Sequence, residues 1–100
     1  YNPILLTDAA IPYQTELLAP YPNPFNPSTT INFSLTEDYE NLSIKVYDIR
    51  GRLAETLYAG FMPYGYHSII WNASDFASGI YFVRLVAGAE IHTQKIMLVK

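Results

Sequence analysis

The stretch Thr29-Thr30-Ile31-Asn32-Phe33-Ser34-Leu35 decides the fold class, because its polar and apolar residues alternate without interruption. Successive side chains of a β-strand point to opposite faces of a sheet, so this alternation indicates a half-buried strand. The same period returns over residues 42–46 and again over 81–85. No segment shows the spacing of an amphipathic helix sustained for three turns. The sequence therefore predicts an all-β domain.

Working outward, we expect about seven short strands, separated by turn residues at intervals of roughly 8–12 residues. The fourth strand rests on the weakest pattern, because its leucines lie four residues apart, as they would in a helix. Trp71 is expected to be the largest core side chain. This pattern predicts an immunoglobulin-like antiparallel β-sandwich. The expected strands cover residues 17–19, 29–35, 42–46, 52–58, 66–71, 80–87 and 91–99.

Prolines and glycines divide these strands. Four prolines fall within residues 20–27, where they fix φ and cannot donate hydrogen bonds, so we expect a stiff, extended crossing. Tyr21 and Phe25 are expected to pack against the domain from this crossing. Residues 48–51 are expected to form a tight turn in which Gly51 takes a positive φ.

One hundred residues predict a single domain, which we place over residues 17–100. Residues 1–16 carry little periodicity and read as a linker from an upstream domain. The chain begins at Tyr1 without a signal peptide, so we expect it to be a piece of a longer polypeptide.

Composition excludes several classes of function. The chain has no cysteine, which excludes disulfides and thiolate metal sites. Six Lys and Arg residues and a net charge of −3 give no basic footprint for nucleic acid. Apolar runs such as Ile96–Val99 are only a few residues long, so no direct membrane span is expected.

A catalytic constellation is not found in the sequence. His67 and His92 stand alone in predicted strands, without the spacing of a metal site. The acidic loop of Glu37, Asp38 and Glu40 lacks the alternating spacing of a calcium loop and reads as a solvated hairpin tip. The glycines are scattered singly, so there is no phosphate-binding loop. We therefore expect no catalytic residues, no metal and no cofactor.

Nine tyrosines raise carbohydrate binding as an alternative, because sugars stack on exposed aromatic faces. Tyr39, Tyr58, Tyr64 and Tyr66 lie near predicted loops or strand ends and are the candidates. Tyrosine is also a favoured residue of half-buried strands, which is the simpler explanation.

Five ordered segments resemble one known family. Residues 21–31, Tyr-Pro-Asn-Pro-Phe-Asn-Pro-Ser-Thr-Thr-Ile, resemble the opening signature of the C-terminal sorting domains of type IX secretion (Por secretion) substrates. These domains are related to the immunoglobulin-like domain of flagellar hook-capping proteins. Residues 46–52, 65–72 and 78–85 resemble the second, third and fourth signatures. The final Lys95-Ile96-Met97-Leu98-Val99-Lys100 is similar to the short apolar strand that closes such proteins.

The resemblance implies a non-catalytic module at the C-terminus of a secreted or cell-surface protein of a Gram-negative bacterium. The protein would pass through the periplasm, and the outer-membrane secretion machinery would read the module as an export address. A sortase would then attach the upstream cargo to the cell surface, although no cleavage site is evident in residues 1–16. By analogy, the recognition surface comprises Pro22, Asn23, Pro24, Gly79, Tyr81, Lys95, Ile96, Met97, Leu98, Val99 and Lys100.

Each of these segments also has a purely structural reading. The Pro-Asn-Pro segment would hold a sheet-to-sheet crossing, and Gly79 would supply a positive φ before a strand. The terminal strand would be mostly core, while its edge could pair with a partner strand or with a second copy. The main rival function is therefore a structural immunoglobulin-like spacer or assembly module of an extracellular protein or filament.

Overall fold

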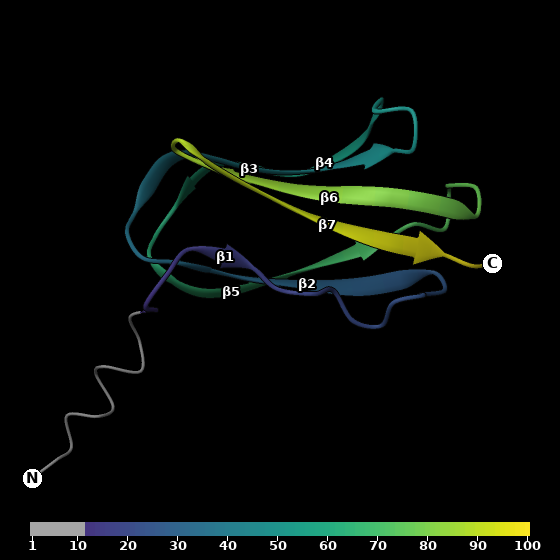
Figure 1. Cartoon of the computed structure of the whole chain (residues 1–100), viewed down its shortest axis with the longest axis horizontal. Coiled ribbons are helices and arrows are strands. Elements are labelled where there is room, and N and C mark those ends of the chain that lie inside the picture. Colours follow the sequence, from purple (N-terminus) through teal and green to yellow (C-terminus); the bar gives the residue numbers. More distant parts are fainter. Residues whose placement is uncertain (1–11) are drawn as a thin grey trace, which may run out of the picture.

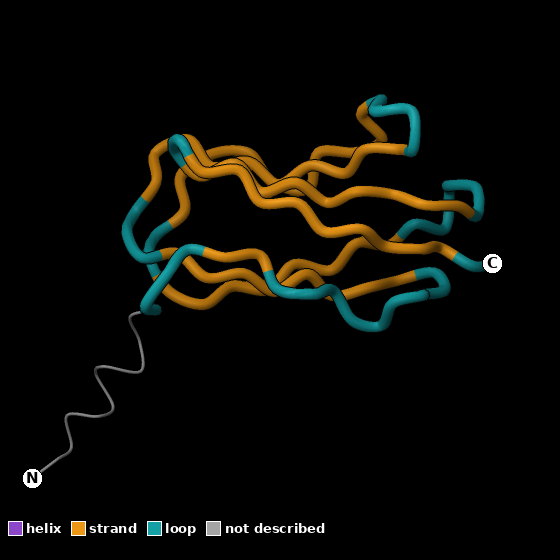
Figure 2. The backbone as a smooth tube through the Cα atoms, in the orientation of Figure 1, coloured by secondary structure: helices purple, strands orange, loops and turns teal. Residues whose placement is uncertain are grey.

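The computed structural model describes residues 12–100, which form seven strands in two antiparallel sheets packed face to face (Figure 1). One sheet has three strands in the order β1-β2-β5, and the other has four in the order β4-β3-β6-β7. Figure 2 shows the strands joined by loops, and the connection between β1 and β2 over residues 18–27 is a long one. The strands are β1 Glu16–Leu17, β2 Ser28–Leu35, β3 Tyr39–Asp48, β4 Leu53–Met62, β5 Gly65–Asn72, β6 Gly79–Ala87 and β7 Glu90–Leu98.

The all-β prediction and the antiparallel sandwich are confirmed. The alternating residues of β2, β3 and β6 are buried at every second position, as the sequence pattern requires. Their inward side chains meet between the two sheets and form one continuous core. Among the fully buried side chains of this core are Ile31, Phe33, Leu35, Leu42, Ile44, Val46, Val83, Leu85, Ile96 and Leu98.

Trp71 is the largest fully buried side chain, as predicted, although it lies on β5 at the edge of its sheet. Three aromatic rings cover it: Phe25, Phe76 and Tyr81 have centroids 5.6, 5.5 and 5.4 Å from that of Trp71. Its Nε1 donates a hydrogen bond of 2.9 Å to Oε1 of Glu55 on β4. This contact joins the edge strands of the two sheets on one side of the sandwich.

Two expectations about the proline-rich crossing had different outcomes. Phe25 is buried, as expected, but Tyr21 is 77% exposed and does not pack. Tyr21 forms a bridge with Thr30, whose neighbour Ile31 faces the core. Residues opposite each other on neighbouring strands share a face, so this bridge turns Tyr21 to the outer face.

Several strand boundaries differ from the sequence prediction. The first strand is Glu16–Leu17 rather than 17–19, and β7 begins one residue earlier than expected and ends at Leu98. The hairpin β3–β4 is longer at its open end, because Tyr39 pairs with Met62. Glu40 therefore belongs to β3 and not to the acidic loop. Gly51 has φ +83° in the predicted turn, which is confirmed.

The linker predicted over residues 1–16 lies largely outside the described residues. Within its last part, the Gln14 carbonyl accepts a hydrogen bond from Ser34 Oγ, and Thr15 Oγ1 accepts one from the Thr36 amide. In the part of the chain that the structure describes, no helix is long and apolar enough to cross a membrane.

Candidate functional site

The proline-rich segment lies along the outer edge of β7, which is the terminal strand of its sheet. The Phe25 amide donates to the Met97 carbonyl at 2.9 Å, and the Val99 amide donates to the Phe25 carbonyl at 3.0 Å. Next to this bridge, Asn23 Nδ2 donates to the Lys95 carbonyl at 3.1 Å. The Met97 amide donates to Asn23 Oδ1 at 2.9 Å. We call the two hydrogen bonds of the Asn23 side chain the Asn23 clamp.

The chemistry of asparagine explains the clamp. A carboxamide carries one acceptor oxygen and two N–H donors, so it presents to a strand the same donor and acceptor as a peptide group. Pro22 and Pro24 flank Asn23 and have no N–H to give to a ladder. The Asn23 side chain thus takes the place that a backbone would have in an added strand. It covers the edge of β7 from Lys95 to Met97.

A groove of about 230 Å³ opens beside the clamp. Ile80 and Met97 lie directly opposite each other on β6 and β7 and form part of its wall. Met97 is 41% exposed although it is apolar. The groove is lined by Asn23, Pro24, Ile80, Lys95, Ile96 and Met97. It therefore combines an apolar floor with one cationic side chain at the rim.

The structure brings part of the predicted recognition set together at this groove and places other members around it. The Pro22 carbonyl accepts a hydrogen bond of 2.8 Å from Thr29 Oγ1. Lys100 Nζ donates to the carbonyls of Ser74 and Phe76 at 2.7 and 2.9 Å. Val99 is exposed, beyond the end of β7.

Gly79 opens β6 opposite Leu98 and has φ +155°, a conformation that L side chains rarely adopt. An added Cβ would meet no atom within 4 Å. Gly79 also borders a second groove of about 340 Å³, which extends toward the turn after β3. Gly79 therefore combines a backbone conformation that favours glycine with a position in the lining of a surface groove.

Three predicted residues face the core rather than the surface. Ile96 and Leu98 are fully buried, as the structural reading of the terminal strand requires. Tyr81 is buried against Trp71, and its hydroxyl donates to the Ala77 carbonyl at 2.6 Å. These side chains shape β6 and β7 from beneath, and the exposed residues above them form the surface.

The clamping role of Asn23 was missed by sequence reasoning, and Ile80 was included only as the residue between Gly79 and Tyr81. Ile80 fell inside a predicted strand and gave no signal of its own. The Pro-Asn-Pro spacing was a signal for Asn23, because prolines on both sides leave the side chain as the pairing group. The partner strand lies more than 70 residues away in the sequence, so the pattern alone does not identify it.

The second signature forms the turn between β3 and β4. Asp48 Oδ1 accepts hydrogen bonds from the amides of Arg50 and Arg52, both at 2.9 Å, and its Oδ2 pairs with Arg52 Nε at 2.9 Å. The backbone hydrogen bond from Arg52 is the main cause that holds the pKa of Asp48 below its ordinary value. Asp48 is therefore a structural anion that closes the turn.

The tyrosines considered for carbohydrate binding do not share one surface role. Tyr39 and Tyr58 are half-buried and pack against the core, while Tyr64 and Tyr66 are exposed. His67 stacks on Phe33 at 5.3 Å. Among residues 12–100, no group of three or more His, Asp or Glu side chains could hold a metal ion.

Comparison with known proteins agrees with the signatures in the sequence. A family model described as a secretion system C-terminal sorting domain matches residues 19–100. A search of curated proteins found no match. The chain is also similar to part of the solved structure of PorZ, described as an essential bacterial surface component of the type-IX secretion system of Porphyromonas gingivalis. The TM-score is 0.57 at 26% identity, and the match covers 84% of this chain but only 11% of PorZ.

Proposed function

The chain belongs to the family of secretion system C-terminal sorting domains, and we propose that the Asn23 clamp and its groove are the surface that the export machinery reads. As such a domain, it marks a larger protein for export through the type IX secretion system, to the cell surface or the medium. In this proposal the domain acts by being recognised and turns over no substrate.

The observation that carries the proposal is the meeting of two distant signatures at one exposed place. The first signature supplies Asn23 and Pro24, and the final strand supplies Lys95 and Met97. These segments are joined only when the chain has folded, so the surface distinguishes a folded domain from an unfolded one. An apolar depression with a polar rim is also the usual anatomy of a protein-binding site.

One section of the edge of β7, residues 90–94, is suited to pairing with a partner strand. Lys95, Met97 and Val99 direct backbone groups outward to Asn23 and Phe25. The hydrogen-bond pattern of an antiparallel strand repeats every two residues, so Ile91 and Thr93 also direct their backbone groups outward. A strand of the secretion machinery would add along residues 90–94. A second copy of the domain would use the same edge, and this is the form of self-association that we propose.

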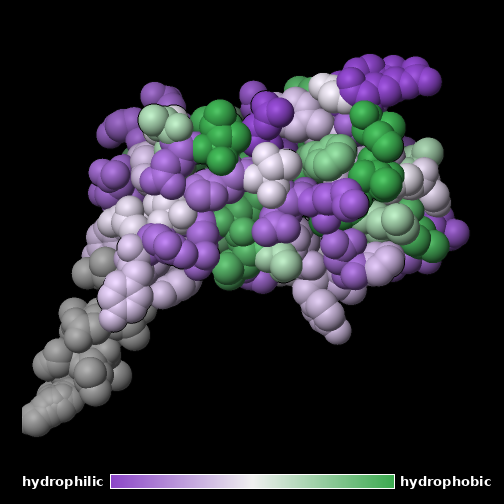
Figure 3. Space-filling model, in the orientation of Figure 1, coloured by the Kyte–Doolittle hydropathy of each residue, from purple (hydrophilic) through white to green (hydrophobic). Residues whose placement is uncertain are grey.

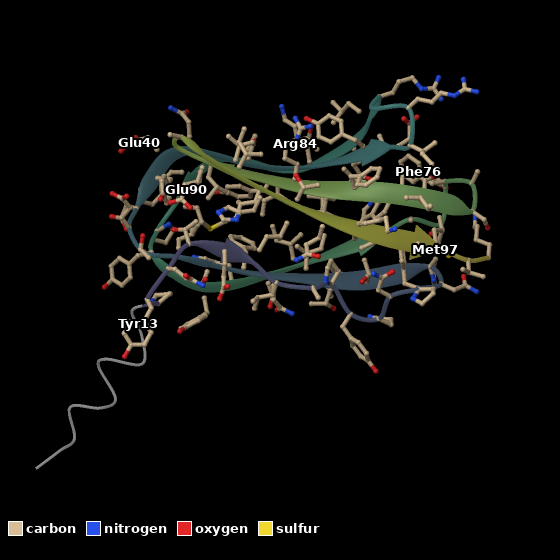
Figure 4. The ribbon with its side chains drawn as sticks, viewed as in Figure 1. Tyr13, Glu40, Phe76, Arg84, Glu90 and Met97 are labelled. Atoms are coloured by element: carbon tan, nitrogen blue, oxygen red, sulfur yellow. The ribbon has the colours of Figure 1, made fainter. Side chains whose placement is uncertain are left out.

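Cargo and groove lie at different ends. Tyr13 lies at one end of the sandwich (Figure 4), and the C-terminus lies at the other, near the end of β7 (Figure 1). A cargo domain upstream would therefore leave the groove open to the outer-membrane machinery. A surface sortase, which the family resemblance implies, would act on the connection between cargo and domain.

Export of the full-length parent protein with Met97→Asp tests the proposal. The variant places a carboxylate at the groove without touching the core, and loss of one anchor contact of about 1.4 kcal/mol or more reduces binding at least about tenfold. We expect the parent to accumulate in the periplasm. The matched control is Ile70→Asp, because Ile70 is an exposed apolar residue of β5 on the other sheet.

Equal export of Met97→Asp, Ile70→Asp and wild type, with equal melting temperatures, would overturn the proposal. That result would favour the structural spacer, which needs no groove.

A further inference from the structure

The turn formed by the second signature has a side-chain pattern that export recognition at the groove does not explain. Ile49 and Leu53 are 66% and 53% exposed, although both are large aliphatic residues. They flank Arg50 and Arg52, so the tip carries two cationic side chains between two apolar ones. The turn rises from the outer side of the four-stranded sheet (Figure 1). Figure 3 shows a strongly hydrophilic projection at this place with hydrophobic side chains directly beneath it.

The sheet below this turn carries further cations. Of the six Lys and Arg residues in the chain, all except Lys100 belong to the turn or to strands β3, β6 and β7. Their neighbours in the strands are buried or half-buried, so Lys45, Arg84 and Lys95 lie on the outer face. Figure 4 shows Arg84 on this outer side. We call these three residues, with Arg50 and Arg52, the cationic face.

Two features of this face, one like-charge pair and a shortage of ion pairs, are unfavourable for an isolated domain. Lys45 and Arg84 are directly opposite each other on β3 and β6, and like charges in this position destabilise a sheet. Of the five cations, only Arg52 forms an ion pair with a carboxylate in the described part of the chain. Arg84 instead lies 4.5 Å from the centre of the Tyr47 ring. An external anion would relieve this repulsion.

The acidic residues that make the chain net negative lie mostly at the other end of the sandwich. Glu40 and Glu90 are at the end opposite to Met97 (Figure 4). Residues 39–48 of β3 span roughly 30 Å at about 3.3 Å per residue. That distance exceeds three Debye lengths of about 8 Å at physiological ionic strength. Glu55 on β4 accepts from Trp71, and Asp75 lies in the loop that Lys100 contacts. The turn cations Arg50 and Arg52 are thus electrostatically separate from the acidic end, whereas Lys45 and Arg84 lie partway along the sheet and nearer to it.

From this arrangement we propose that the cationic face and the Ile49–Leu53 tip dock the domain on the surface of an anionic phospholipid bilayer. The phosphates of the headgroups pair with Lys45, Arg50 and Arg84, and the two aliphatic side chains of the tip enter the headgroup region. An acidic polypeptide would satisfy the cations but would leave the exposed aliphatic tip unexplained. The combined pattern of charge and apolar side chains therefore favours a lipid surface.

Docking in this way would also set the position of the groove. Lys95 belongs to the cationic face and lines the groove beside Asn23, so the docked domain holds the groove at the membrane surface. The proposal does not depend on the groove, because it rests on residues of the turn and of the outer face.

Co-sedimentation of the 100-residue chain with vesicles tests this docking. The vesicles are either pure phosphatidylcholine or an equal mixture of phosphatidylcholine and phosphatidylglycerol. We expect binding to the mixed vesicles only, with loss at about 1 M salt, where the Debye length is about 3 Å. The double variant Arg50→Gln/Arg84→Gln should bind roughly 25-fold more weakly, at about fivefold per cation. Ile49→Asp should weaken binding at every salt concentration at which the wild-type chain binds.

Glu40→Gln is the control for a change of net charge, because Glu40 lies at the acidic end, and it should bind as wild type does. The substituted side chains are on the surface, so unchanged melting temperatures would show that the fold is intact. Equal binding to both kinds of vesicle, no binding, or no effect of the double variant would overturn the proposal. It would also fail if inorganic phosphate or poly-L-glutamate displaced the chain at matched anion concentration, since the site would then serve a free anion or an acidic protein.

Discussion

Asn23→Ala is the most informative single change, because it removes the clamp and leaves the rest of the proline-rich crossing in place. The substitution deletes the hydrogen bonds to the Lys95 carbonyl and from the Met97 amide. The bridge between Phe25 and β7 is not touched directly.

The expected cost follows from these two hydrogen bonds. Each contributes about 0.5–1.5 kcal/mol net, and Asn23 is exposed, so water partly replaces the lost partners. We therefore expect the free energy of unfolding to fall by about 1–2 kcal/mol in total. For a domain of this size, the melting temperature should drop by about 4–8 °C per kcal/mol.

Amide hydrogen exchange would show where this loss occurs. Opening of the β7 edge should become easier by 1–2 kcal/mol, which accelerates exchange of the Met97 amide by roughly 5- to 30-fold. Amides of β2 that face β5 should change only with global stability. The matched control is Asn26→Ala, an exposed asparagine of the same segment that also precedes a proline. If both variants accelerate Met97 exchange equally, the clamp does not hold the strand.

Three further predictions concern the fold. Trp71→Phe should lower the free energy of unfolding in urea by about 1–3 kcal/mol, because it removes the hydrogen bond to Glu55 and leaves a void. Glu55→Gln keeps an acceptor and should lower it by less than about 1 kcal/mol. Equal losses for the two variants would contradict this. Gly79→Ala should lower the free energy of unfolding by about 1–3 kcal/mol through backbone strain alone, since no atom obstructs the new methyl group. An unchanged urea midpoint would refute this prediction. The pKa of Asp48 is lowered in the folded state, so its stabilisation is present above the unfolded pKa of about 4 and is lost as pH falls through the folded pKa. The melting temperature of Asp48→Asn should therefore be lower than that of wild type near neutral pH and should converge with it in acid; a constant difference would be contrary evidence.

The sequence was sufficient to predict the strands whose pattern is determined by burial on one face. Ile31, Phe33 and Leu35 alternate with polar residues, because one side of β2 meets the core and the other meets solvent. The limits of β4 were less predictable. Its last residues follow the register of β3, in which Tyr39 pairs with Met62, and pairing between strands leaves no local signal in either sequence.

The site was predictable only in part, because it depends on long-range geometry. The Pro-Asn-Pro spacing marked Asn23, but its two partners on β7 become neighbours only through the fold. Tyr21 was predicted to pack because it is aromatic, and the bridge to Thr30 places it on the outer face instead. Tyr81, in contrast, was predicted to belong to the recognition surface, and the structure buries it against Trp71.

Photo-crosslinking in exporting cells would test most directly whether the machinery contacts the groove. A benzoylphenylalanine would replace Met97 in the full-length parent, and Ile70 in a matched control on the other sheet. We predict that position 97 crosslinks to an outer-membrane protein of the type IX system and that position 70 does not. Crosslinks of equal strength from both positions, or normal export with no crosslink from position 97, would contradict the proposed recognition surface.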